Sequence, residues 1–327
     1  MLWPIVALIG GIILLIFSAD KFVEGASATA KRLGMPSLLI GMVIIGFGSS
    51  MPEMVISALA AWDGNPGLAL GNAFGSNITN IALILGITAM ISPIAVKSSV
   101  LVKELPLLTG ITVLTAFLVY TDGELDRLDG WLLILVFLGL MTWSIYEGMR
   151  TPTDDLANAV DQELATPLPM RLAVTYLILG LTFLVISSRM LVWGGTEIAQ
   201  ALGISNLLIG LTIVAIGTSL PELASCIAAV RKNEHELALG NVIGSNMFNT
   251  SMVIGIAGVI APSKLDTAIL TRDMPVLGVL TLALFVMGYR FYGSGTGRIN
   301  RYEGSILLAS YLGYMTLLAA MAVTGNA

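Results

Sequence analysis

The chain has 327 residues and is rich in apolar side chains but poor in charged ones. Hydrophobic residues make up 56% of it and charged residues 11%, far below the about 25% that is typical of soluble domains. This composition excludes an ordinary soluble globular protein and indicates a membrane protein. The net charge of −5 adds little, because charge on a membrane protein is informative by side rather than by sum.

Apolar stretches recur along the whole chain, each long enough to cross a hydrocarbon core about 30 Å thick. The first stretch lacks a basic leader and a cleavage site, so we expect it to be a retained helix. Hydropathy predicts ten spans, at residues 3–26, 36–60, 67–91, 104–121, 129–148, 170–192, 205–229, 236–260, 273–290 and 303–323. The predicted fold class is an all-α polytopic membrane protein.

The two halves of the sequence resemble each other. LLIGMVIIGFGSSMPE at 38–53 is identical to LLIGLTIVAIGTSLPE at 207–222 at 9 of 16 positions. LALGNAFGSNITN at 68–80 is identical to LALGNVIGSNMFN at 237–249 at 9 of 13 positions. The same offset in sequence number separates the members of both pairs, which indicates an internal duplication of nearly the whole chain.

Five spans in each half have a topological consequence. Because five is odd, the second half starts on the opposite side of the membrane, so the two repeats are inverted, as in many secondary transporters. We assign residues 1–148 to the first five-helix repeat, 149–169 to a short linker and 170–327 to the second repeat. The linker is acidic but lacks the spacing of a calcium-binding loop, so we expect a solvated connection.

Positive charge is distributed unevenly between the two predicted sides. Loops on the side of the linker hold eleven Lys and Arg residues, against four on the other side. This places the linker in the cytoplasm and both termini outside, in an inner or plasma membrane. An aromatic belt near the predicted outer ends agrees with this orientation and consists of Trp3, Trp62, Trp131 and Trp193.

Two glutamates stand out among the few ionisable residues at mid-membrane depth. Glu53 and Glu222 occupy equivalent positions, follow long apolar stretches and have no basic residue nearby in sequence. A carboxylate at the bilayer centre costs on the order of 2.5–3.5 kcal/mol, so each glutamate requires a compensating partner. Because no Lys or Arg is placed to neutralise them, we interpret the missing positive charge as a bound cation.

Other polar residues in the spans have simpler interpretations. Glu104 and Asp273 lie at predicted helix starts directly after Lys103 and Arg272, so we expect local ion pairs. The single cysteine, Cys226, excludes an internal disulfide. Its apolar surroundings favour a packing role over that of a nucleophile.

Each of the two mid-membrane glutamates directly follows a proline. Pro52 and Pro221 lack an N–H group and displace a helical hydrogen bond, which frees carbonyl groups one turn earlier. Glycines nearby help the backbone to unwind. Freed carbonyls are costly in lipid but become ligands where they line an ion site. The sequence therefore predicts a break in both helices.

A stripe of Asn, Ser and Asn at four-residue spacing follows in each half, and this spacing places each set on one helix face. The six residues are Asn72, Ser76, Asn80, Asn241, Ser245 and Asn249. Such a stripe alone is more typical of helix packing than of ligands. Together with the hydroxyls at the breaks and the two glutamates, it can supply the six to eight oxygens that Ca²⁺ prefers. The absence of His and Cys from these motifs argues against zinc or copper.

The paired motifs GSSMPE with GNAFGSN and GTSLPE with GNVIGSN resemble those of the calcium/cation antiporter superfamily. Within it, the chain is most similar to the sodium/calcium exchanger family and its prokaryotic members. The resemblance spans the whole chain and implies two inverted five-helix halves around a central cluster of Na⁺ and Ca²⁺ sites. It also implies that the first helix of each half slides across the core to alternate access.

The resemblance assigns roles residue by residue. Glu53 and Glu222 would be shared by Ca²⁺ and Na⁺. The hydroxyls that would bind Na⁺ belong to Ser50, Ser219, Ser76 and Ser245. Backbone carbonyls would bind Ca²⁺ at Ser49 and Thr218 and Na⁺ at Gly46 and Ala215, while Asn80 and Asn249 would complete the ring.

The sequence thus predicts an electrogenic Na⁺/Ca²⁺ antiporter in a lipid bilayer, with no cofactor beyond the transported ions, no nucleic acid and no obligate protein partner. An enzyme is disfavoured because no nucleophile–base pair is available. Coupling to H⁺ or K⁺, another divalent cargo such as Mn²⁺, and a cation channel remain alternatives. Potassium-dependent relatives tend to carry Asp where this chain has Asn249, and proton-coupled relatives typically replace the Ser-Asn pair of GSN.

Overall fold

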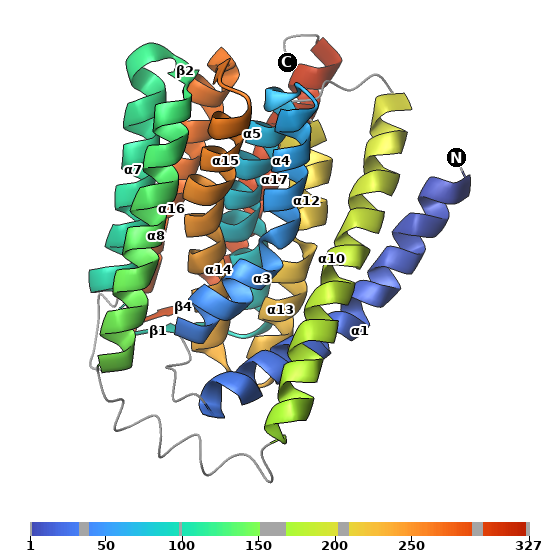
Figure 1. Cartoon of the computed structure of the whole chain (residues 1–327), viewed down its shortest axis with the longest axis vertical. Helices are drawn as coiled ribbons and strands as arrows, with labels where there is room; N and C mark the ends of the chain where they lie inside the picture. The colour runs from blue at the N-terminus through green and yellow to red at the C-terminus, as the bar shows by residue number, and fades with distance from the viewer. Residues whose placement is uncertain are drawn as a thin grey trace.

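The computed structural model describes residues 2–32, 39–97, 100–150, 168–201, 209–289 and 297–324, and it is almost entirely helical (Figure 1). Eight helices in these segments are long and apolar enough to cross a membrane. Two further pairs of helices, each bent at a break, bring the number of candidate spans to ten. The predicted all-α membrane fold is confirmed, while most of the predicted linker lies outside the described residues.

The elements follow in chain order, with η for π-helical segments, whose hydrogen bonds span five residues. The first repeat contains α1 (Leu2–Arg32), η1 (Ile40–Ile45), α3 (Gly46–Ser49), α4 (Met51–Trp62), α5 (Pro66–Ile78), η2 (Thr79–Ile84), α6 (Leu85–Ile91), β1 (Ile94–Val96), η3 (Val100–Glu104), α7 (Leu105–Asp122), β2 (Glu124–Leu125) and α8 (Arg127–Arg150). The second contains α10 (Met170–Ala201), η4 (Gly210–Val214), α12 (Ala215–Thr218), α13 (Leu220–Arg231), α14 (His235–Met247), η5 (Phe248–Val253), α15 (Ile254–Ile260), β3 (Ser263–Lys264), η6 (Ile269–Asp273), α16 (Met274–Gly288), β4 (Gly297–Ile299) and α17 (Arg301–Thr324).

The π-helical segments recur at the offset of the sequence repeat. η2 and η5 begin at Thr79 and Phe248, and η3 and η6 begin at Val100 and Ile269, so both pairs start at equivalent positions of the two repeats. A π-turn inserts an extra residue into a helix and is rare outside functional sites. Its appearance at equivalent places in both halves shows that the duplication extends to irregular features of the backbone.

Two small antiparallel sheets join the repeats at opposite ends of the bundle (Figure 1). β1 pairs with β4 at one end, with Ile94 opposite Ile299. β2 pairs with β3 at the other end, with Leu125 opposite Ser263. Each sheet takes one strand from each repeat, so both ends of the bundle are fastened by backbone hydrogen bonds between the halves.

The spans that carry the polar stripes form the centre of the bundle. The spans over 66–91 and 235–260 are each 78% buried, whereas the other straight spans are 22–39% buried and expose apolar side chains around the bundle. α14 packs against η1 and α3 of the first repeat, and α5 packs against η4 and α12 of the second. Each central helix therefore contacts the broken helix of the opposite repeat, while α1 and α10 pack together along one side (Figure 1).

Glycines allow this close approach of the central and broken helices. A Cβ atom added to Gly244 of α14 would lie 2.5 Å from the Met42 carbonyl oxygen of η1. One added to Gly75 of α5 would lie 2.7 Å from the Ala215 Cβ of α12. There is thus no room for a side chain at Gly244 or at Gly75, as in other small-residue contacts between membrane helices.

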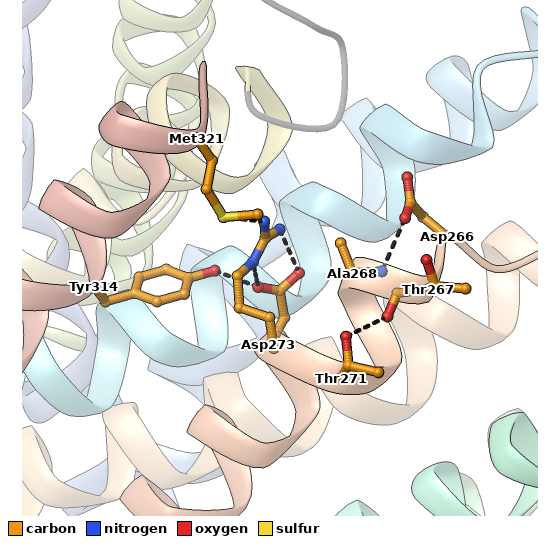
Figure 2. A network of polar contacts seen from close by, with 8 residues as sticks. Asp266, Thr267, Ala268, Thr271, Asp273, Tyr314 and Met321 are labelled. Carbon is orange, nitrogen blue, oxygen red and sulfur yellow. Dashed lines mark hydrogen bonds and ion pairs between the residues drawn. The ribbon is translucent and has the colours of Figure 1, made fainter. Parts of the chain in front are cut away.

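The ion pair predicted for Asp273 is confirmed. Arg272 donates from Nε and Nη2 to the two carboxylate oxygens of Asp273, at 2.6 and 3.0 Å. The Tyr314 hydroxyl donates to Asp273 Oδ1 at 2.9 Å, and Arg272 Nη1 lies 3.3 Å from Met321 Sδ (Figure 2). The buried carboxylate is neutralised locally, and the network joins η6 to α17.

Lys103 and Glu104 do not form the equivalent ion pair. Lys103 Nζ lies over the Trp143 ring, 4.8 Å from its centroid, in a cation–π contact. Oε2 of the buried Glu104 has no hydrogen-bond partner in the described part of the chain. When the first turns of α8 and α17 are aligned, the position equivalent to Tyr314 is Leu140, which cannot donate a hydrogen bond.

We expect Gly244→Ala to destabilise the protein, because its methyl group would meet backbone atoms that move only with their helix. The loss should be about 1–3 kcal/mol, seen as a lower thermal midpoint of the purified protein in detergent. Gly110→Ala in α7 is the matched control, since nothing lies within 4 Å of its added Cβ atom. Equal midpoints for the two variants would contradict the packing described.

Candidate functional site

Both helices that carry a Pro-Glu pair are broken at a serine, as predicted. Ser50 adopts φ and ψ of −81° and 1°, and Ser219 adopts −84° and 3°, outside the α-helical region. α3 and α4 meet at 42°, and α12 and α13 meet at 43°. Pro52 and Pro221 lie in the first turn of the following helices and prevent regular hydrogen bonding across each break.

The proline at each break removes one backbone donor from the helical ladder. The Ser50 N–H donates to the Gly46 carbonyl at 3.0 Å, and the Met54 N–H donates to the Ser50 carbonyl at 3.2 Å. Between these two bonds, Pro52 has no N–H to donate to the carbonyl of Gly48, four residues earlier. The second repeat has the same pattern, with bonds from Ser219 to Ala215 and from Leu223 to Ser219 on either side of Pro221.

Gly46 and Ala215 lie where the broken helices contact the opposite repeat. A Cβ atom added to Gly46 would lie 3.3 Å from the Ser245 backbone nitrogen, and Ala215 lies against Gly75. The carbonyls of both accept a helical hydrogen bond, at 3.0 and 3.1 Å. Each also lies within reach of a neighbouring hydroxyl, Ser49 Oγ at 3.5 Å from Gly46 and Thr218 Oγ1 at 3.3 Å from Ala215, so an ion at either carbonyl would compete with that hydroxyl.

The two glutamates face each other across the repeat boundary and are both fully buried. Ser219 Oγ donates to Glu53 Oε1 at 3.3 Å. In the reverse direction, Ser50 Oγ donates to Glu222 Oε1 at 3.2 Å. Oε2 of each carboxylate has no hydrogen-bond partner among the described residues.

The serines of the two stripes join this cluster, but with different partners. Ser245 Oγ donates to Glu222 Oε1 at 3.2 Å. Ser76 Oγ instead lies 3.4 Å from Thr218 Oγ1. The carboxylate of Glu222 thus receives two hydroxyl groups and that of Glu53 receives one.

Asn80 in η2 and Asn249 in η5 are buried in the same central helices. Their side chains are 0% exposed, and neither the nitrogen nor the oxygen of either amide has a hydrogen-bond partner among the described residues. A buried polar atom without a partner costs about 1–3 kcal/mol. These four atoms and the two free carboxylate oxygens would be satisfied by ions and water held between the repeats.

The available donors fit a hard cation. In the described segments no three His, Cys, Asp or Glu residues come together, so a zinc- or copper-type cluster is not formed there. Two carboxylates remain, with the hydroxyl, amide and carbonyl oxygens around them. Such an all-oxygen set of two charged and several neutral groups suits Ca²⁺ and Na⁺.

The structure also identifies residues to which the sequence assigned no role. Asn72 and Asn241 contact the broken helix of the opposite repeat. Asn72 Oδ1 accepts from Thr218 Oγ1 at 3.1 Å, and Asn241 Oδ1 accepts from Ser49 Oγ at 3.1 Å. The polar stripe contained both residues, and their equivalent positions in the two repeats were the signal that they act as a pair.

Two surface cavities lie next to the broken helices. The first, of about 300 Å³ between α1 and α13, is lined by Leu220 and Leu223, which flank Glu222. The second, of about 320 Å³ between α4 and α10, includes Ile56, one turn beyond Glu53. Each cavity is therefore lined by residues of one broken helix close in sequence to its glutamate, while the glutamate itself does not line it.

We expect Ca²⁺ to stabilise the folded protein, because a cation held between two buried carboxylates binds only the native state. At a Ca²⁺ concentration about 100-fold above the dissociation constant, the gain should be about 2.7 kcal/mol, measured as a higher thermal midpoint. Glu53→Gln should abolish this gain. Glu124→Gln, which alters an exposed carboxylate paired with Lys264, should keep it; an undiminished gain in Glu53→Gln would exclude Glu53 as a ligand.

Comparison with known proteins gives a consistent result. The family profile described as "Sodium/calcium exchanger protein" matches residues 3–146 and 172–320. Over 309 residues the chain is 47% identical to CaxA of Alkalimonas amylolytica, covering 94% of this chain and 96% of that protein. It is 37% identical over 326 residues to the inner membrane protein YrbG of Escherichia coli, covering 97% of each.

A solved structure of the sodium-calcium exchanger NCX_Mj, soaked with Na⁺ and Sr²⁺, has the same fold. It matches with a TM-score of 0.80 at 30% sequence identity, covering 96% of this chain and 98% of that one. The profile match, the full-length relatives and this structural match agree. The chain belongs to the sodium/calcium exchanger family, which consists of cation antiporters and not of enzymes.

Proposed function

We propose that the chain exchanges Na⁺ for Ca²⁺ by binding the two ions alternately between Glu53 and Glu222. The observation that carries this proposal is the buried pair of carboxylates, each with one oxygen that no described residue satisfies. Two negative charges at this depth require positive charge from outside the protein. A transported cation supplies that charge and can leave again. A permanent basic partner at the same place would block its release.

The same two carboxylates make the binding of the two ions mutually exclusive. Together they balance the charge of one Ca²⁺, and the neutral oxygens nearby complete its coordination. Na⁺ uses the same class of oxygen ligand, so occupation by Na⁺ displaces Ca²⁺. Exchange of one Ca²⁺ for more than two Na⁺ moves net charge across the membrane, and we propose this electrogenic mode.

The position of the two cavities supports alternating access. One is bordered by α1 and the other by α10, and these two helices pack against each other along their length. An added Cβ atom on Gly25 of α1 would meet the backbone of Leu177, and one on Gly180 of α10 would meet that of Phe22. We propose that this close pair moves as a unit, opening one cavity while closing the other.

The remaining assignments are part of the same proposal. The ligand roles expected from the resemblance are retained, with Asn at position 249 disfavouring K⁺ cotransport. The inverted repeats are residues 1–148 and 170–327, with the linker in the cytoplasm and both termini outside. The four tryptophans of the predicted belt are exposed on the surface of the bundle, as interfacial anchors require.

Purified protein in sealed vesicles tests the coupling ion. Vesicles loaded with Na⁺ should take up Ca²⁺, whereas vesicles with an equal K⁺ or H⁺ gradient should not. An inside-positive potential should accelerate the uptake if more than two Na⁺ leave for each Ca²⁺ that enters. Uptake that persists without any opposing cation gradient would refute antiport and favour a channel.

Glu222→Gln should abolish this exchange while leaving the protein folded. Losing one charged partner from a buried site costs about 3 kcal/mol, or about 100-fold in affinity. The readout is the initial rate of Na⁺-driven Ca²⁺ uptake, compared with that of Glu124→Gln. A rate close to that of the unaltered protein would refute the role assigned to Glu222.

A further inference from the structure

Asn72 and Asn241 have a role that the ligand assignment leaves open. We infer that they are positioning residues, each fixing the glutamate ligand of its own repeat against the broken helix of the other repeat. This inference rests on the proposed function, because it concerns the same cation site. The evidence for the inference is the set of hydrogen bonds that the two asparagines make.

Asn72 is fully buried in α5 and binds on both sides of the repeat boundary. Its Nδ2 donates to the Glu53 carbonyl at 3.3 Å and to Ser57 Oγ at 2.9 Å, both within the first repeat. Its Oδ1 lies 3.1 Å from Thr218 Oγ1 of the second repeat, whose single proton it shares with the Val214 carbonyl at 3.0 Å. One planar amide therefore connects the residue that offers a carboxylate with a residue at the break of the opposite broken helix.

Asn241 makes the same contacts in the opposite sense. Its Nδ2 donates to the Glu222 carbonyl at 3.3 Å and lies 3.4 Å from Cys226 Sγ. Its Oδ1 lies 3.1 Å from Ser49 Oγ, whose single proton it shares with the Ile45 carbonyl at 2.9 Å. Each partner in one repeat has its counterpart at the equivalent position of the other. The same hydrogen-bond arrangement therefore occurs in both repeats.

The chemistry of the partners fixes the orientation of each amide. A backbone carbonyl can only accept, so the nitrogen of Asn72 must face Glu53. The oxygen of the amide is then directed at the hydroxyl of Thr218. Turning the amide over would place its oxygen against the carbonyl oxygen of Glu53, which is costly.

This arrangement acts on ion affinity because the ligands come from both repeats. Ca²⁺ binds oxygens at about 2.3–2.6 Å, so ligands held at the correct spacing bind more tightly than ligands that must be ordered first. The amide of Asn72 holds the Glu53 backbone and the helix break at Thr218 at a fixed separation. It does so without itself contacting the ion.

Ser57 and Cys226 are the second partners of the two amide nitrogens. The hydroxyl of Ser57 lies 2.9 Å from Asn72 Nδ2, whereas the larger sulfur of Cys226 lies 3.4 Å from Asn241 Nδ2. Both also donate to a carbonyl of the following helix, Ser57 to Ala69 and Cys226 to Ala238. A thiol therefore substitutes for a hydroxyl at this place in the fold.

The first test compares Asn72→Leu with Asn77→Leu by calorimetric titration of the purified protein with Ca²⁺. Asn77 is equally buried on α5 but bonds to Thr250 Oγ1 at 2.9 Å instead of to the site. Asn72→Leu should raise the dissociation constant at least about tenfold, the effect of one lost net hydrogen bond, and Asn77→Leu less than about threefold. Equal shifts in the two variants would overturn the inference.

A second pair of variants keeps the inference testable if Asn72→Leu does not fold. Ser57→Ala removes one partner of Asn72 Nδ2 and should weaken Ca²⁺ binding about threefold or more. Ser57→Cys introduces the residue that the second repeat uses and should recover most of that loss. Binding by Ser57→Cys as weak as that by Ser57→Ala would point to a packing role and overturn the inference.

The same preparations separate this inference from the proposed function. If the unaltered protein binds Ca²⁺ but shows no Na⁺-driven uptake, the coupling ion is wrong, while the titrations still measure the role of Asn72. If the unaltered protein exchanges Na⁺ for Ca²⁺ and Asn72→Leu binds Ca²⁺ equally well, the positioning role alone is wrong.

Discussion

Two buried carboxylates that face each other without a basic partner set the conditions for the rest of this structure. Ion pairs between described residues, such as Arg272 with Asp273 and Lys97 with Glu236, do not involve Glu53 or Glu222. Like charges at this depth are tolerated only where neutral oxygens surround them and a cation can enter. The broken helices, the polar stripes and the exclusion of lipid from the centre all follow from that requirement.

The inverted duplication meets this requirement because each repeat completes the other. Ser50 contacts the carboxylate of Glu222, and Ser219 contacts that of Glu53. The glycines of the central helices bring the opposite breaks close enough for these bonds to form. A single repeat would hold one carboxylate, one break and no opposing donors, so the site exists only where the two halves meet.

The sequence predicted those features that have a local chemical cause. Pro52 and Pro221 identified the breaks, and the constant offset paired the two glutamates before any contact was known. The π-helical turn at Asn80 was not predictable, because an inserted residue leaves no mark on side-chain periodicity. The contact between Asn72 and Thr218 depends on packing between the repeats, and that between Lys103 and the Trp143 ring depends on packing between helices, so neither could be predicted from local sequence.

The two halves have diverged where strict symmetry is not needed, and this divergence reaches the site itself. Glu222 accepts hydrogen bonds from Ser50 and Ser245, whereas Glu53 accepts one from Ser219. Donors from the protein compete with a cation for the same lone pairs, so the carboxylate with fewer donors keeps more of its charge for the ion. The carboxylate of Glu53 therefore has one hydroxyl donor fewer than that of Glu222, and the symmetric frame contains a site with unequal sides.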